Sequence, residues 1–233
     1  MSKYKTVAES IEKDIQNGVY HDVDKLPTED ELIETFNVSR NTIRKAIEIL
    51  TKKGLVFSIQ GSGLFVRRSS CEGCVNLENF YGLTTAFNGN VVSKIVEFSL
   101  INASEWLASK MKCKIGAEIY YVERIRYLDK KPYVYEYSYF NKEVVHYLSK
   151  DIIQSSIYKY ITQDLKLQIG YVDRIIFADK LTSKQAIGLD LNEGDPALVS
   201  HNIAMLKNGI VFDYSIDVHH YKETKFLKLS NFH

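Results

Sequence analysis

Apolar residues recur at three- and four-residue spacing in three short stretches of the first 54 residues, which is the spacing of helices that bury one face. The first stretch predicts a helix over residues 4–17. Thr28 with Glu31 forms a capping box that opens a second helix, and Ser39 caps a third, which ends before Gly54. We therefore expect three helices, the last two joined by a tight turn.

Strand-like alternation follows at residues 55–59 and 64–67, on either side of the small, polar sequence Gln-Gly-Ser-Gly at 60–63. This pattern predicts a β-hairpin whose tip is small enough to lie against a DNA backbone or in a minor groove. Two helices joined by a brief turn and followed by a hairpin form a winged helix-turn-helix, in which the third helix reads DNA. A helical bundle with a surface hairpin is the plainer alternative.

From Val75 onward the pattern changes to long alternating strands rich in tyrosine, separated by short helices, which predicts an α+β domain. The expected strands cover residues 92–101, 119–127, 133–140, 169–177, 197–206 and 210–219. The helices between them are expected to be capped by Ser104, Ser156 and Thr182. Residues 132–138 and 209–215 match weakly, which indicates two related hairpins, with chance similarity as the alternative.

One face of these strands is expected to be polar, because side chains alternate along a strand. Arg124 and Arg126 share a face of one strand. Glu136 and Ser138 share a face of the next, and an odd-length loop would bring the two pairs together, whereas an even loop would separate them. The last strand carries a similar row, namely Asp213, Ser215, Asp217 and His219. Such faces could grip an anionic, polyhydroxylated ligand, or they are only the solvent sides of antiparallel strands.

The composition fits a soluble, globular chain of two domains, with 45% hydrophobic and 25% charged residues among 233. No run approaches the roughly 20 apolar residues of a membrane span, and the polar N-terminus does not resemble a signal sequence, so we expect a cytoplasmic protein. The predicted domains are residues 1–70 and 81–233, with a linker at 71–80. Three cysteines are too few for a disulfide scaffold, and their odd number favours reduced thiols.

The charge distribution indicates where a nucleic acid would bind. The chain carries a net charge of only +1, but residues 9–34 hold nine acids and two lysines, whereas residues 39–68 hold seven basic residues and one acid. A basic segment over the predicted reading helix and hairpin is an electrostatic footprint for nucleic acid. Arg40 and Arg44 suit base reading because arginine can bond both O6 and N7 of guanine.

The first domain resembles a known family in several separate segments. LPTEDEL, FNVSRNTIRKAIEIL, KKGLV and GSGLFV follow each other between Leu26 and Val66 and resemble the winged-helix domain of the GntR family of bacterial transcription regulators. The resemblance implies base contacts by two arginines, with phosphate or minor-groove contacts beside them. The implied DNA-binding residues are Ser39, Arg40, Asn41, Thr42, Arg44, Gln60, Gly61 and Gly63. Asp30 departs from the pattern, because some members have a DNA-contacting arginine there, and we do not count it.

Residues 75–233 resemble the effector-binding UTRA domain of the HutC subfamily, an antiparallel α/β fold similar to chorismate lyase. The segments IYYVERIRYLDKKPYVYEYSYF, SIYKYI, LKLQIGYVDRI and FDYSIDVHHY carry this resemblance. In members that sense sugar phosphates, paired arginines and a serine-x-tyrosine hold the phosphate, and acids on the two hairpins hold the sugar. The matching residues are Arg124, Arg126, Ser156 and Tyr158 for the phosphate and Glu136, Asp213 and His219 for the sugar, joined by Thr84 or Thr85.

The expected function is that of a homodimeric repressor of a sugar-utilisation operon, which a small phosphorylated sugar releases from palindromic, double-stranded operator DNA. A regulator that senses a non-sugar metabolite is the alternative. A lyase-like enzyme is less expected, because the sequence contains no G-x-S-x-G, H-E-x-x-H or G-x-x-x-x-G-K motif. We expect no cofactor and no metal, although Cys71 and Cys74 could supply half of a zinc site or a thiol sensor.

Overall fold

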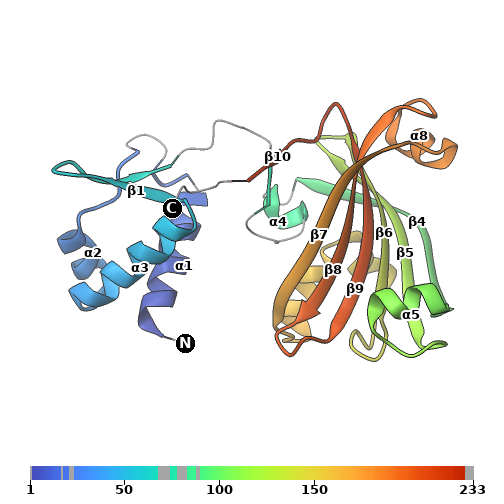
Figure 1. Cartoon of the computed structure of the whole chain (residues 1–233), viewed down its shortest axis with the longest axis horizontal. Coiled ribbons are helices and arrows are strands. Elements are labelled where there is room, and N and C mark those ends of the chain that lie inside the picture. The colour runs from blue at the N-terminus through green and yellow to red at the C-terminus, as the bar shows by residue number, and fades with distance from the viewer. Residues whose placement is uncertain are drawn as a thin grey trace. The chain divides into compact units, whose positions relative to one another are not determined.

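The computed structural model describes residues 2–16, 18–20, 24–67, 74–77, 83–87 and 90–228. The chain forms two compact units, each described here by itself (Figure 1). The first consists of Met1–Glu78 with Phe226–His233, and the second of Asn79–Lys225. The finer domain limits expected from the sequence stay a prediction.

The described residues up to Val66 form three helices and a hairpin, as the sequence predicts. They are α1 (Lys3–Gln16), α2 (Glu29–Phe36), α3 (Arg40–Lys52), β1 (Val56–Ile59) and β2 (Gly63–Val66). The capping box of Thr28 and Glu31 is confirmed at the start of α2, and the Ser39 hydroxyl caps α3. Asn37 makes the turn between these two helices with a left-handed φ of 47°, which asparagine tolerates.

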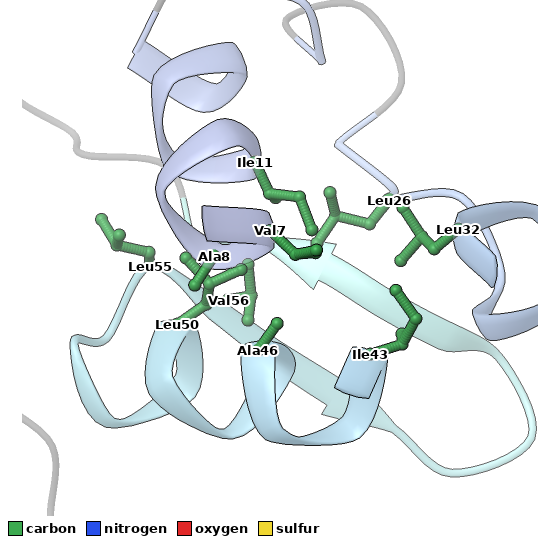
Figure 2. Packing of buried hydrophobic residues seen from close by; sticks show 10 residues of the cluster. All are labelled: Val7, Ala8, Ile11, Leu26, Leu32, Ile43, Ala46, Leu50, Leu55 and Val56. Carbon is green, nitrogen blue, oxygen red and sulfur yellow. The ribbon is translucent and has the colours of Figure 1, made fainter. Parts of the chain in front are cut away.

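Apolar residues from the three helices meet in one core (Figure 2). Val7 and Ile11 of α1, Leu32 of α2, and Ile43 and Leu50 of α3 belong to this cluster, and none is more than 4% exposed. Full burial of such a side chain contributes about 1.5–3 kcal/mol. The core therefore fixes the apolar face of α3 inward and leaves its basic face outside.

Two short strands also belong to the first unit: β3 (Val75–Asn76) pairs in parallel with β10 (Phe226–Leu227). Cys74, just before β3, is disulfide-bonded, whereas Cys113 is a free thiol. The expectation of reduced thiols is therefore wrong for Cys74, because an odd number of cysteines still allows one pair. Cys71 lies outside the described residues.

The second unit is built on an antiparallel sheet of six strands in the order β4-β5-β6-β9-β8-β7 (Figure 1). The strands are β4 (Val91–Asn102), β5 (Glu118–Leu128), β6 (Lys131–Asn141), β7 (Ile169–Lys180), β8 (Pro196–Leu206) and β9 (Val211–His220). The helices are α4 (Leu83–Ala86), α5 (Glu105–Met111), α6 (Lys150–Gln154), α7 (Ile157–Lys159) and α8 (Ser183–Leu189), with a π-helical turn, η1 (Tyr160–Asp164), after α7. The α+β class is confirmed, as are the caps at Ser104, Ser156 and Thr182. No helix among the described residues is long and apolar enough to cross a membrane.

The sheet has two halves with the same order of elements. One half is β4, α5, β5 and β6, and the other is β7, α8, β8 and β9, with β6 and β9 paired in the middle. The two weakly similar segments of the sequence, 132–138 and 209–215, thus lie in hairpins at equivalent places. Because β6 and β9 run antiparallel, Glu136 lies opposite Asp217 and not opposite Asp213.

Helices pack against both faces of the sheet. On the face that we call outer, Tyr135 packs with Ala186 of α8. On the other face, which we call inner, Val122 and Phe140 pack with Ile153 of α6 and with the residues of α7. Polar side chains on the inner face are therefore enclosed between the sheet and its helices.

A bulge in the β5–β6 hairpin decides which residues share the inner face. The turn is Asp129-Lys130, with left-handed φ values of 49° and 68°. A two-residue turn alone would place Arg124 opposite Tyr135. Arg124 would then share a face with Tyr135, and Glu136 and Ser138 would lie on the other face of the sheet. A bulge next to Arg126 shifts the register by one residue, so that Arg124 lies opposite Glu136. The odd spacing that brings the polar pairs together thus comes from a turn and a bulge combined.

Candidate functional site

The first turn of α3 presents most of its predicted DNA-binding residues to solvent. Arg40, Asn41 and Arg44 are exposed, and Thr42 is half-buried. The Ser39 hydroxyl lies 3.0 Å from the hydroxyl of Thr42 at the cap of the helix. The N-terminus of α3 adds main-chain N–H groups to this surface, which favours contact with a phosphate.

The tip of the β1–β2 hairpin is exposed and shaped by two glycines. Gln60, Gly61 and Gly63 are all exposed. Gly61 and Gly63 have φ values of 76° and 112°, at which a side chain would be strained. A Cβ added to Gly61 would meet nothing within 4 Å, so the backbone conformation and not the space requires glycine there. The tip therefore presents bare backbone where the predicted wing would approach DNA.

Arg124 and Arg126 lie on the inner face of β5 and share one carboxylate. Each is only 4% exposed. Arg124 donates to one oxygen of Glu136 at 2.6 Å, and Arg126 donates to the other at 3.4 Å. Arg124 also donates to the carbonyl of Ile153 at 2.7 Å, and Ser138 donates to Glu136 at 3.1 Å. The two pairs expected on one face are thus brought together.

Thr84 of α4 completes the surroundings of Arg126. Its hydroxyl accepts a hydrogen bond of 2.6 Å from Arg126. Of the two threonines considered, the structure therefore places Thr84 at the arginines, while the side chain of Thr85 lies outside the described residues. The Nε atoms of Arg124 and Arg126 are buried without a hydrogen-bond partner among the described residues. Buried donors of this kind are rare, and they fit a site that a ligand completes.

Ser156 and Tyr158 lie at the start of α7. The Ser156 hydroxyl caps this helix by accepting a 3.3 Å hydrogen bond from the N–H of Lys159. The Tyr158 hydroxyl donates to Asp213 at 2.7 Å. A residue expected at the phosphate end of the site therefore contacts an acid expected at the sugar end.

Asp213 is a buried acid that accepts the bond from Tyr158 through one of its two oxygens. It is 1% exposed, and its Oδ1 atom has no hydrogen-bond partner among the described residues. Burial raises its pKa well above the ordinary value; the bond from Tyr158 opposes this rise, and the negative charges of Glu136 and Asp217 add to it. A carboxyl group that keeps its proton and has a free oxygen can exchange hydrogen bonds with a ligand hydroxyl.

Polar residues outside the set that the resemblance implies extend the inner face across β7, β8 and β9, namely Arg174, Ser200, Asn202 and Asp217. Asn202 donates to Asp217 at 2.8 Å and accepts from Arg174 at 2.6 Å. Ser200 lies 3.3 Å from Asp217 and 3.1 Å from Nε2 of His219. The polar run Ser200-His201-Asn202 in the middle of the otherwise apolar β8 is the signal that could have found Ser200 and Asn202.

The ionisable groups of the inner face have shifted pKa values. Burial would raise the pKa of Glu136, but the charges of Arg124 and Arg126 lower it to about 2. Asp217 lies opposite Glu136, and burial with the charge of Glu136 raises its pKa to about 7. Burial, with the charge of Arg124, lowers the pKa of Arg126 to about 10. Burial also lowers the pKa of His219 to about 3, so its ring is neutral at pH 7.

Positive charge therefore exceeds negative charge on this enclosed face. Arg124 and Arg126 face the ionised carboxylate of Glu136, because the raised pKa of Asp213 favours its protonated form and Asp217, with a pKa of about 7, is only partly ionised near neutral pH. Asp213, Ser215 and His219 are at most 4% exposed, so the alternative that this row is the solvent side of the sheet is wrong. Two buried arginines whose Nε donors have no partner among the described residues suit a small anion. In the described part of the chain, no group of His, Cys, Asp and Glu side chains is placed to hold a metal ion.

A helix-turn-helix unit with exposed arginines, followed by a unit with a buried arginine cluster, defines a regulator with a DNA-binding part and an effector-binding part. The chain belongs to the GntR family of bacterial regulatory proteins: the model of that family matches residues 3–66, and the model of the UTRA domain matches residues 88–225. The first match implies DNA binding, and the second implies a small-molecule effector. The pair of domains is consistent with the HutC subfamily.

Relatives along the whole chain support this assignment. The chain is 35% identical to the HTH-type transcriptional regulator YydK of Bacillus subtilis (strain 168), over 99% of this chain and 98% of the relative. The crystal structure of YydK matches with a TM-score of 0.82 over 99% of this chain and 100% of that one, at 35% identity. The mannosyl-D-glycerate transport/metabolism system repressor MngR of Escherichia coli (strain K12) is 26% identical over 96% of this chain and 93% of the relative. The family and these relatives are transcription regulators, not enzymes.

Proposed function

We propose that the chain is a homodimeric repressor that binds a palindromic operator and releases it when a small phosphorylated sugar binds to the inner face of the sheet. Two-fold symmetry of the protein would match the symmetry of the operator. One relative, MngR, is named as the repressor of a mannosyl-D-glycerate system, which supports a sugar-related role. The protein would act in the cytoplasm, where bacterial DNA is found.

The observation that carries the phosphate assignment is the pair Arg124 and Arg126. Both guanidinium groups are buried, both bond the same carboxylate of Glu136, and in both the Nε–H has no hydrogen-bond partner in the described part of the chain. Arginine is suited to phosphate because its planar fork can donate two parallel hydrogen bonds. A phosphate would supply the missing acceptors and balance the excess positive charge.

The residues proposed for each site are those that the resemblance implies. DNA would be contacted by Ser39, Arg40, Asn41, Thr42, Arg44, Gln60, Gly61 and Gly63. The effector would be held by Arg124, Arg126, Thr84, Ser156 and Tyr158 at the phosphate, and by Glu136, Asp213 and His219 at the sugar. Thr84 is favoured over Thr85 because its hydroxyl already bonds Arg126.

The ligand must distinguish two arrangements of the dimer in order to act. A ligand shifts an equilibrium only by the difference between its affinities for the two states. The effector would therefore bind more tightly to a dimer whose reading helices no longer match the spacing of the operator. Each α3 would then lose its place in the major groove, and the operator would be released.

Thermal unfolding of the full chain against sugar 6-phosphates, their unphosphorylated parents and unrelated metabolites tests this proposal. A ligand at 100 times its dissociation constant adds about 2.7 kcal/mol to the free energy of unfolding, which corresponds to about 5–10 °C in Tm for a chain of this size. We expect one phosphate ester to shift Tm while its parent sugar does not. If only uncharged or carboxylate metabolites shift Tm, the phosphate assignment fails and the alternative of a non-sugar effector stands.

Two threonine variants make this test specific for the arginine pair. Thr84→Val removes the hydroxyl that bonds Arg126 and keeps the shape of the side chain. Thr162→Val removes an exposed hydroxyl of η1 that donates to the main-chain carbonyls of Tyr158 and Lys159 in α7. The shift caused by the phosphate ester should shrink in the first variant and persist in the second. Equal shifts in both variants would remove Thr84 from the site.

A further inference from the structure

The two arginines at the start of α3 are held by acids from the start of α2. Arg40 lies 2.5 Å from Asp30 and 3.5 Å from Glu29, and Arg44 lies 3.1 Å from the same Glu29. The acids stand in the first turn of α2, where negative charge also favours the helix. The turn between α2 and α3 thus brings two acids onto the two side chains with which the chain would contact DNA.

The two arginines use different nitrogens in these pairs. Arg44 donates only through Nε, to both oxygens of Glu29 at 3.2 and 3.1 Å. Its two terminal nitrogens have no hydrogen-bond partner among the described residues, and terminal nitrogens are the donors that bond guanine or phosphate side by side. Arg40, in contrast, donates through both terminal nitrogens, one to Asp30 and one to Glu29. Arg44 is therefore oriented and available, whereas the tip of Arg40 is occupied.

We propose that Asp30 is a positioning residue that restrains Arg40 and so lowers the affinity of the protein for DNA of random sequence. This inference rests on the proposed DNA interface at α3. In random DNA, an arginine gains affinity by neutralising a phosphate, and Arg40 must first leave Asp30 to do so. Arg44 keeps its terminal donors for a base. The two arginines therefore differ in role: Arg44 is available to read a base, and Arg40 is restrained by Asp30.

The size of the effect follows from the exposure of the pair. The Arg40 and Asp30 side chains are 52% and 72% exposed, and exposed ion pairs are weak. We therefore expect release of Arg40 to tighten binding to random DNA by about twofold to fivefold for each chain that contacts the duplex. One more phosphate contact also steepens the dependence of log K on log salt by about 0.9.

The test is fluorescence anisotropy of the full chain with a labelled random-sequence duplex, over a series of salt concentrations. The variants are Asp30→Asn, Arg40→Ala and the double variant, with Glu34→Gln as the matched control. Glu34 lies one turn further along the same face of α2, is exposed, and forms no ion pair among the described residues. Asp30→Glu keeps the carboxylate and should behave as the parent protein. Thermal unfolding of each variant checks that it is folded.

We expect Asp30→Asn to tighten binding and steepen the salt dependence by more than Glu34→Gln does. In the Arg40→Ala background, Asp30→Asn should tighten binding by no more than Glu34→Gln does. The inference is overturned if Arg40→Ala weakens binding equally in both backgrounds, or if Glu34→Gln reproduces the gain of Asp30→Asn. Arg44→Ala distinguishes failure of this inference from failure of the proposed DNA interface at α3. If Arg44→Ala leaves DNA binding unchanged, the proposed interface itself fails.

Discussion

Asp217 should make the stability of the second unit depend on pH, and Asp217→Asn should remove that dependence. Asp217 lies opposite Glu136 in the middle of the sheet and accepts hydrogen bonds from Asn202 and Ser200. An asparagine keeps one oxygen for these two donors and carries no charge. The substitution therefore removes the repulsion between Asp217 and Glu136 and leaves much of the hydrogen bonding in place.

The sign and the size follow from the pKa of Asp217. It rises from 3.8 to about 7 on folding because of burial and the charge of Glu136, so the folded protein binds this proton more tightly than the unfolded chain does. The contribution of Asp217 to the free energy of unfolding is therefore fully present below about pH 4 and is lost as pH rises to about 7. The shift corresponds to about 4 kcal/mol at most, at about 1.4 kcal/mol per pKa unit. We expect a gain of about 1–3 kcal/mol for Asp217→Asn at pH 8, because the new amide must find its own partner.

Urea unfolding of the parent and Asp217→Asn proteins at pH 5 and pH 8 measures this gain. Between pH 5 and pH 8 the parent should lose about 2–3 kcal/mol of stability through this carboxyl, because the unfolded chain is already ionised at pH 5 and the folded protein loses its proton only near pH 7. The gain from Asp217→Asn should therefore be larger at pH 8 than at pH 5. Asp173→Asn, at an exposed position on β7, is the matched control and should show no gain at either pH. If Asp217→Asn has the same effect at both pH values, or destabilises the protein at pH 8, then the reasoning about the Glu136–Asp217 pair is refuted.

Three further changes test other parts of the structure. Arg44→Ala should lose about 1–3 kcal/mol of preference for operator over random DNA; unchanged preference at matched salt, measured by competition, would contradict it. Lys184→Ala should destabilise the protein by about 1–3 kcal/mol in urea unfolding, because it leaves the fully buried Glu123, which Lys184 bonds at 2.8 Å, without this cation. Adding Glu123→Gln to the Lys184→Ala protein should restore much of the lost stability. Gly188→Ala should lower Tm, because its Cβ would lie 2.5 Å from the ring of the buried Tyr135, and an unchanged Tm would show that this ring can move.

Local features of the fold could be predicted from the sequence because their causes are local. The capping boxes at Thr28 and Thr182 depend on residues three positions apart, and both are present in the structure. The hairpins follow from alternation on either side of polar turns. The bulge beside Arg126 could not be predicted in this way, because it depends on how two strands pair over their whole length.

The site could be predicted only where one hairpin contains it. Arg124 and Glu136 belong to the same hairpin, so the register of a single pair of strands decides whether they meet. Arg174, Asn202 and Asp217 come from three strands, and their contact depends on the pairing of β7, β8 and β9. Burial of the polar face could not be predicted from alternation either, because α6 and α7 cover it from elsewhere in the chain.

The coupling between DNA and effector is tested most directly by measuring operator affinity with and without the ligand that raises Tm. The operator would first be selected from random duplexes with the ligand-free protein. We expect a saturating phosphorylated sugar to weaken operator binding by about 5-fold to 150-fold, and the operator to weaken sugar binding by the same factor. The Thr84→Val protein should need more sugar for the same release. Operator affinity that does not change when the ligand saturates the protein would show that the two sites are not coupled.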